Sequence, residues 1–235
     1  MFGGSTIGAL VRAIEREVGD PTRRVRSVTA EVPGPTLVGP SELRVETLRA
    51  GSGQTTACAR VVQADGVTAF ATVVLAKDRA VEADTFVDLE PPRPPPWRDL
   101  PRVPMEQGGP TFAKHFEFRT AGPFPFTGGA SATALGWIRP ATPVRVVDAA
   151  TVVALCDAWW PASIVRFSTF RPIGTVAFTM QIVGDPRAID LADAPLAYRA
   201  EVWSQRDGWI VEQRELWTEA GELLALNQQT IAIIK

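Results

Sequence analysis

The chain has 235 residues, of which 46% are hydrophobic and 21% charged, and its formal net charge at pH 7 is -2. This composition is typical of a globular protein with a substantial core, and so small a net charge gives no support for a nucleic-acid partner or an anionic membrane surface. No apolar stretch approaches the roughly 20 residues of a membrane-spanning helix and no signal peptide is visible, so the sequence predicts a cytoplasmic protein without membrane association.

The first half of the chain predicts one helix followed by a run of strands. Apolar residues recur at helical spacing over residues 7–18, Ser5 is the expected N-cap, and Gly19 is the expected stop. Four segments of strand character follow, at residues 26–32, 42–48, 55–63 and 67–76. Turn signals at residues 51–53 and 64–66 separate the later strands, which indicates an antiparallel meander.

A proline-rich segment at residues 90–109 separates the two halves. It contains the run EPPRPPPWRDLPRVP, in which the prolines remove backbone N–H donors and fix φ, so we expect neither a helix nor a central strand to pass through it. The segment is therefore interpreted as a linker between an N-terminal repeat, residues 1–89, and a C-terminal repeat, residues 110–235.

The second half repeats the plan of the first. Strand-like segments at residues 111–120 and 132–139 lead to a helix capped by Asp148, whose apolar face is expected to extend to Trp160. Four further strands are expected at residues 175–183, 197–204, 209–218 and 223–234. The first half shows no strand before its helix, so we expect that strand to be absent or lost by truncation of the N-terminus.

An internal duplication explains the similarity of the two halves. Residues 44–76 lie on residues 199–231 without a gap when they are shifted by 155 positions, and the shift places Gly53 on Gly208. Because turn spacing sets strand length and register, the coincidence of the turns is more informative than the few identities. Each repeat is then one helix covering one face of an antiparallel sheet, and the two repeats are expected to pair as a pseudo-dimer.

Several runs of the chain resemble the type II acyl-CoA thioesterases. They are FGGSTIGALVRAI and LRVETLRAGSGQTTACARVVQADG in the first repeat, and ALCDAWWPA, GTVAFTMQIV and LLALNQQTIAII in the second; PFTGGASATALGWIRP is similar to actinobacterial-style members. The resemblance covers nearly the whole chain. It implies an α+β double hotdog fold, in which a long helix is wrapped by a curved antiparallel sheet twice over. It also implies hydrolysis of acyl-CoA thioesters in fatty acid metabolism, with CoA present only as part of the substrate and with neither cofactor nor metal.

The resemblance also implies a catalytic set. The family has an Asp on the helix of the second repeat, a Thr or Ser at the start of the next strand and a Gln on the last strand. The matching residues are Asp157 in LCDAWWP, Thr175 in IGTVAFT and Gln229 in LNQQTIA. Gln228 is the neighbouring alternative, and because adjacent strand residues point to opposite faces, only one of the two can reach the site. An aromatic or His-Phe pair usually follows the Thr strand, and its replacement by MQIVGD is expected to alter the acyl pocket more than the chemistry.

These residue types suit thioester hydrolysis. A carboxylate can orient a water molecule and accept its proton, while a hydroxyl and an amide can hold that water in place. Backbone N–H groups at Gly3 and Gly4, just before the first helix, are expected to polarise the thioester oxygen across the interface between the repeats. Trp159 and Trp160 are expected either in the wall of the acyl pocket or in the core.

The first repeat lacks the catalytic set, so one active site per chain is expected. The counterparts are Arg12 for Asp157, Val74 for Gln229 and Ser27 for Thr175.

Two other functions remain open. An enoyl-CoA hydratase of related fold would use an Asp-His pair, but the only histidine, His115, is distant in sequence from Asp157. A non-catalytic acyl-CoA or acyl-ligand binding protein would keep the groove and the glycines without needing Asp157. Cys58 and Cys156 lie in apolar surroundings and are interpreted as inert core thiols. A homodimer or a higher homo-oligomer is expected, while the acyl group and the arginines that bind the CoA phosphates stay open.

Overall fold

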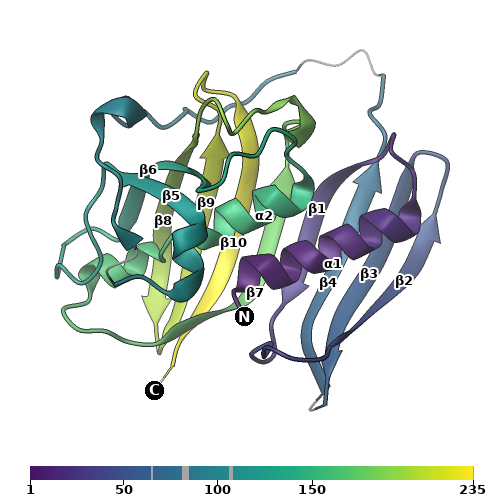
Figure 1. Ribbon diagram of the computed structural model, residues 1–235, viewed down its shortest axis with the longest axis horizontal. Coiled ribbons are helices and arrows are strands. Elements are labelled where there is room, and N and C mark those ends of the chain that lie inside the picture. The colour runs from purple at the N-terminus through teal and green to yellow at the C-terminus, as the bar shows by residue number, and fades with distance from the viewer. Residues whose placement is uncertain (65, 81–84, 106–107, 235) are drawn as a thin grey trace.

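The computed structural model describes residues 1–64, 66–80, 85–105 and 108–234, and within these residues it forms one ten-stranded sheet. The strand order is β2-β3-β4-β1-β7-β10-β9-β8-β6-β5, and the paired strands are antiparallel. Two helices, α1 and α2, lie on one face of this sheet (Figure 1). The repeats join through β1 and β7 in the middle of the sheet. This arrangement is the predicted α+β double hotdog.

The first repeat contains α1 and four strands. Their bounds are α1 (Gly3–Val18), β1 (Arg24–Glu31), β2 (Glu42–Ala50), β3 (Gln54–Gln63) and β4 (Gly66–Ala76). Strands β2, β3 and β4 form the predicted meander, whereas β1 lies beyond β4 and pairs with the second repeat. The turn predicted at residues 64–66 includes residue 65, which lies outside the described residues.

Helix α1 begins earlier than the sequence predicted. Phe2 occupies the N-cap position, and Ser5 lies inside the first turn, where its hydroxyl donates to the Phe2 carbonyl at 2.7 Å. Gly3 and Gly4 are therefore part of the helix rather than a segment before it. Gly19 ends the helix as predicted, with a left-handed φ of 60° that a residue without Cβ adopts at little cost.

The second repeat contains α2 and six strands. Their bounds are β5 (Phe116–Thr120), β6 (Thr133–Pro140), α2 (Ala149–Ala158), β7 (Ile173–Ile182), β8 (Leu196–Arg206), β9 (Trp209–Trp217) and β10 (Leu223–Ile233). Asp148 caps α2 as predicted, accepting a hydrogen bond from the Thr151 N–H at 2.8 Å.

Two elements of this repeat are shorter in the structure than the sequence predicted. Thr111–His115 is a 3-10 turn rather than the first half of a strand, because the chain turns back after Pro110, whose carbonyl accepts from the Ala113 N–H. Helix α2 ends at Ala158, so Trp160 lies beyond the helix and not on its face.

A single apolar core spans both repeats. It lies between the two helices and the inner face of the sheet, and Ile7, Leu10, Val152 and Val153 are among its fully buried members. A second, smaller cluster on the sheet is joined by Trp97 of the proline-rich segment. Within the described residues, no helix combines the length and the apolar character needed to cross a membrane.

Candidate functional site

The end of α2 meets the start of α1, and Asp157 lies at this junction. The Gly4 backbone N–H donates to Asp157 Oδ2 at 2.6 Å. The approach is close because Gly4 has no side chain: a Cβ built on it would lie only 2.9 Å from the Cβ of Asp157. The positive end of the α1 dipole therefore faces the carboxylate, across the interface between the repeats where the sequence placed the glycines.

Strands β7 and β10 bring the other two predicted residues to the same place. Gln229 Nε2 donates to Asp157 Oδ1 at 3.1 Å, and Thr175 Oγ1 donates to Gln229 Oε1 at 2.9 Å. Gln229 is 1% exposed, whereas Gln228 is exposed on the opposite face of the sheet, so Gln229 is the residue that reaches Asp157. Residues from three separate segments thus form one hydrogen-bonded chain.

Asn227 extends this chain, and the sequence analysis missed it. Its Oδ1 accepts the second N–H of Gln229 at 3.0 Å, and its Nδ2 donates to the Thr179 carbonyl at 2.8 Å. With both partners of its amide defined, Gln229 must turn its nitrogen toward Asp157 and its oxygen toward Thr175. The available signal was the spacing of two residues on one strand, which places Asn227 and Gln229 on the same face.

Asp157 is a half-buried residue, and opposing effects act on its carboxyl. Burial raises the pKa of Asp157 above its usual range, while the positive charge of Arg214 and the hydrogen bonds from Gly4 and Gln229 oppose that rise without cancelling it. A carboxyl with a raised pKa is a stronger base once it is ionised. Burial also raises the pKa of the neighbouring Cys156 thiol to about 12, so this thiol is not a nucleophile at neutral pH.

A buried ion pair lies directly behind Asp157, and it too was missed from the sequence. Arg214 Nε and Glu212 Oε1 are 2.8 Å apart, and the two side chains are 1% and 0% exposed. Arg214 also donates to the Cys156 carbonyl at 3.0 Å. The available signal was a pair of opposite charges two residues apart in strand β9, which places them on the same face of the sheet.

The two tryptophans that follow Asp157 are both members of the core. Trp159 is 1% exposed and stacks on Tyr198, with ring centroids 4.6 Å apart. Trp160 is 9% exposed and lies 4.9 Å from Trp159 between ring centroids. This packing anchors the chain immediately after Asp157.

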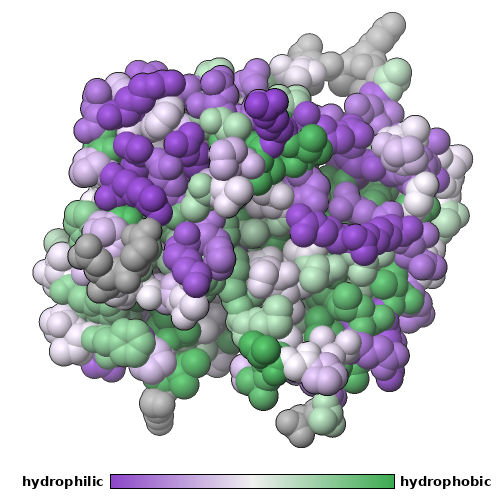
Figure 2. All heavy atoms as spheres, viewed as in Figure 1, coloured by the Kyte–Doolittle hydropathy of each residue, from purple (hydrophilic) through white to green (hydrophobic). Residues whose placement is uncertain are grey.

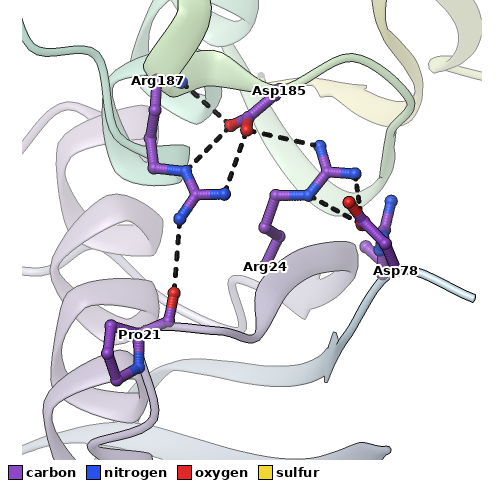
Figure 3. Close-up of polar contacts among 6 residues, drawn as sticks. Pro21, Arg24, Asp78, Asp185 and Arg187 are labelled. Atoms are coloured by element: carbon purple, nitrogen blue, oxygen red, sulfur yellow. Dashed lines mark hydrogen bonds and ion pairs between the residues drawn. The ribbon is translucent and has the colours of Figure 1, made fainter.

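The opposite end of the helix pair, where α1 ends and α2 begins, has a different arrangement. Arg12, which corresponds to Asp157, binds the α2 cap residue Asp148 with Nε and Oδ2 2.8 Å apart. A pocket of about 380 Å³ opens beside this pair. The charges around the pocket bind each other, as Figure 3 shows: Arg187 binds Asp185 and the Pro21 carbonyl, while Arg24 binds Asp78.

The strand register identifies the first-repeat counterpart of Gln229. Gln229 lies opposite Glu212, and Ala57, which is 155 positions before Glu212, lies opposite Val73. The prediction of Val74 was therefore wrong by one residue. The reason is that the hairpin between β9 and β10 holds one residue more than the hairpin between β3 and β4, so a constant shift fails beyond the turn.

The strand register also identifies the first-repeat counterpart of Thr175. Thr175 lies opposite Ile231 just before a bulge in β7, and Val25 lies opposite Leu75 just before the equivalent bulge in β1. Val25, not the predicted Ser27, therefore corresponds to Thr175. The first repeat has valines at both strand positions, which supports the prediction that it lacks the set.

Comparison with known proteins gives a consistent family assignment. A family profile described as the acyl-CoA thioesterase C-terminal domain matches residues 88–233, and one described as the acyl-CoA thioesterase N-terminal domain matches residues 1–76. No curated protein matches the sequence of the chain.

Solved structures of similar fold cover almost the whole chain. A hot dog fold protein from Alicyclobacillus acidocaldarius is 25% identical, with a TM-score of 0.86 over 100% of this chain and 87% of the other. A tesB protein from Mycobacterium avium subs. paratuberculosis is 18% identical, with a TM-score of 0.81 over 100% and 88%. An acyl-CoA thioesterase II from Mycobacterium marinum is 19% identical, with a TM-score of 0.79 over 99% and 89%.

Proposed function

Because the chain belongs to the acyl-CoA thioesterase family and is thus a thioester hydrolase, we propose that it cleaves an acyl-CoA thioester with a water molecule activated by Asp157. The observation that carries this proposal is the hydrogen-bonded chain from Thr175 through Gln229 to Asp157, which the Gly4 N–H closes from the other repeat. A carboxylate held by donors on both oxygens, on a residue that is only half-buried, has the geometry of a general base.

The proposed reaction needs only water, the thioester and this chain. Asp157 accepts a proton from the water, the water oxygen attacks the thioester carbonyl carbon, and the electron pair of the C=O bond moves to the oxygen. When the carbonyl re-forms, the carbon–sulfur bond breaks and the CoA sulfur leaves with its electron pair. The proton held by Asp157 then passes to the leaving sulfur, which releases the CoA thiol and regenerates the carboxylate. Gln229 and Thr175 hold Asp157 and the water in line, which supplies the positioning that a bimolecular attack lacks.

The start of α1 is assigned to the thioester oxygen. Since the Gly4 N–H already holds Asp157, we assign the oxyanion to the Gly3 N–H and to the positive end of the helix dipole. A Cβ at Gly3 would lie 3.1 Å from Asp157 Oδ2, so the lack of a side chain there leaves room for a thioester oxygen beside the carboxylate.

Further parts of the proposal concern the substrate and its setting. We place the acyl chain against Trp159 and Trp160, because these apolar side chains lie two and three residues after Asp157. Figure 2 shows hydrophobic residues gathered on the lower half of the helix-bearing face, where α1 begins, and polar residues above them. We also assign the reaction to fatty acid metabolism in the cytoplasm, carried out without a cofactor by a homodimer or a higher homo-oligomer.

One observation disfavours hydration of an enoyl-CoA. That reaction requires a second proton-transfer group beside the aspartate, and the only histidine, His115, is exposed in the 3-10 turn before β5. The hydrogen-bond partners of Asp157 are the Gly4 N–H and the Gln229 amide, and neither of them titrates at neutral pH.

The test is a screen for thiol release across acyl-CoA chain lengths, with aryl and branched acyl groups included. Release of free CoA by the wild-type protein is the expected result. Binding of acyl-CoA without release of thiol from any substrate would instead identify a non-catalytic binding protein. Loss of enoyl-CoA absorbance without thiol release would identify a hydratase.

A further inference from the structure

We infer that Glu212 and Arg214 form a positioning unit for Asp157, in which Arg214 fixes the end of α2 and places a positive charge behind the carboxylate. The inference rests on the proposed role of Asp157 as the base. It concerns residues that do not touch the substrate, and it would explain why Glu212 and Arg214 of β9 are almost completely buried.

Arg214 binds the carbonyls at the end of the helix that carries Asp157. Its Nη1 donates to the carbonyl oxygens of Cys156 at 3.0 Å, Asp157 at 3.4 Å and Trp159 at 3.5 Å. Carbonyls in the last turn of a helix have no partner within the helix, and a cation there also interacts favourably with the helix dipole. The guanidinium therefore fixes the backbone from which the Asp157 side chain projects.

Glu212 holds Arg214 in this orientation and also fixes the segment that follows the helix. One carboxylate oxygen binds Arg214 Nε at 2.8 Å, and the other accepts from the Ala162 N–H at 2.8 Å. The backbone on both sides of Trp159 is thus attached to one buried ion pair. A small shift of this segment would move Asp157 relative to Gly4 and Gln229.

The first repeat provides an internal comparison. The residues 155 positions before Glu212 and Arg214 are Ala57 and Ala59, and both are buried. The fold therefore forms its sheet at this level without buried charges, in the repeat whose helix carries Arg12. Buried ion pairs are weak evidence for stability, because apolar residues of similar volume often replace them without loss. The buried ion pair occurs behind Asp157 in the second repeat and is replaced by alanines in the first, which points to a role at the site.

Arg214 is the positive charge among the groups that face Asp157. Glu212 on β9, Tyr198 on β8 and Cys156 on α2 interact electrostatically with Asp157 as well, while α1, β7 and β10 present neutral groups. Burial raises the pKa of Asp157, and the charge of Arg214 is the largest effect that opposes the rise. Glu212 acts in the opposite sense, since like charges disfavour each other's ionisation.

The test is the pH dependence of kcat/KM for thiol release by the wild type and three variants. A base must be ionised, so activity falls below its pKa, and Arg214→Met should move this acid limb upward by about one pH unit. Glu212→Gln removes the like charge and should leave the limb in place or move it downward. Arg214→Lys keeps the charge but not the fork of donors, so it should lower kcat while its limb stays near that of the wild type.

Arg199→Met is the matched control, because Arg199 forms an ion pair with Glu215 of the same strand β9 on the other face of the sheet. It should leave the acid limb unchanged. A lower kcat in Arg214→Met with the limb at the wild-type pH would overturn the inference and leave the pair a structural one. If Arg214→Met does not fold, an upward shift in Glu212→Gln or in Arg214→Lys would overturn it equally. A wild type that hydrolyses no thioester defeats the proposed function itself, which is a separate outcome.

Discussion

Replacing Gly4 with alanine tests the close approach of the two helices at Asp157. The added Cβ would lie 2.9 Å from Asp157 Cβ and 2.7 Å from Phe2 Cζ. Non-bonded carbon atoms pack at about 3.5–4.0 Å, so the start of α1 must retreat from α2 by about 0.6–1.1 Å. The Gly4 N–H bond to Asp157, now 2.6 Å, would be stretched to the limit of hydrogen bonding or beyond it.

The magnitudes separate an effect on activity from an effect on folding. Overpacking costs about 1–3 kcal/mol and alanine regains about 1 kcal/mol of helix propensity over glycine, so Gly4→Ala should lower the free energy of unfolding by about 0–2 kcal/mol. A misplacement of about 1 Å at a reacting group can lower the rate about 100-fold, so the loss of kcat should be far larger than the loss of stability suggests.

Thiol release and thermal unfolding are the two measurements, with Gly8→Ala as the control. Gly8 lies on the same helix, and a Cβ there would be 3.2 Å from the Ala150 carbonyl oxygen and 3.4 Å from the Ala150 Cβ, away from Asp157. This control should keep the wild-type kcat. A folded Gly4→Ala variant with unimpaired kcat would show that the contact contributes nothing to the alignment of Asp157.

Three further predictions follow from the same site. Burial raises the pKa of Asp157 in the folded state above its unfolded value of about 3.9. The wild type should therefore lose stability as the pH rises from the unfolded to the folded pKa, while Asp157→Asn should not. The melting temperature of the variant minus that of the wild type should increase from about pH 4 upward, and a difference independent of pH would contradict the raised pKa. Gln229→Leu leaves three polar partners unsatisfied and should lower kcat by about 100-fold or more, whereas Gln228→Leu on the exposed face should retain activity; equal losses in both would remove Gln229 from the site. Thr175→Ser keeps the hydroxyl that donates to Gln229 and should retain most of the activity, while Thr175→Val should lose about 10-fold or more, and a fully active Thr175→Val would exclude a role for the hydroxyl.

The three residues proposed for catalysis could be predicted from the sequence, but the residues that support them could not. Asp157, Thr175 and Gln229 each lie in a motif of their own, so each could be matched separately. Asn227 and Arg214 act through the directions of their side chains and through contacts with segments far away in the chain. Such contacts depend on which face of a strand is buried, and that is decided by the register of the whole sheet.

The errors at the first repeat have the same origin. A constant shift of 155 positions matches the residues before the hairpin turn, but the extra residue in the second hairpin moves every later residue to the other face. Val73 was therefore missed in favour of Val74. Ser27 was chosen over Val25 from its position in the strand, because the pairing register is not visible in the sequence. Helix α1 was predicted to begin at the polar Ser5, whereas the structure begins it at Gly3, since close packing against Asp157 requires glycine there.

The duplication has left the two ends of the helix pair with opposite charge arrangements. At one end, Asp157 lies in the last turn of α2 and its carboxylate binds the first turn of α1. At the other end Arg12 takes that place and binds Asp148, the cap of α2. An arginine cannot act as a base at neutral pH, so we expect one catalytic site in each chain.

The role of Asp157 as the base is decided by kcat/KM for thiol release in Asp157→Asn. Asp148→Asn is the matched control, since it makes the same change on the same helix and asparagine is also a good N-cap. Loss of a general base should lower kcat/KM by about 100-fold to 10,000-fold in Asp157→Asn, while Asp148→Asn stays near the wild-type value. Hydrolysis by Asp157→Asn at the wild-type rate would show that Asp157 is not the base.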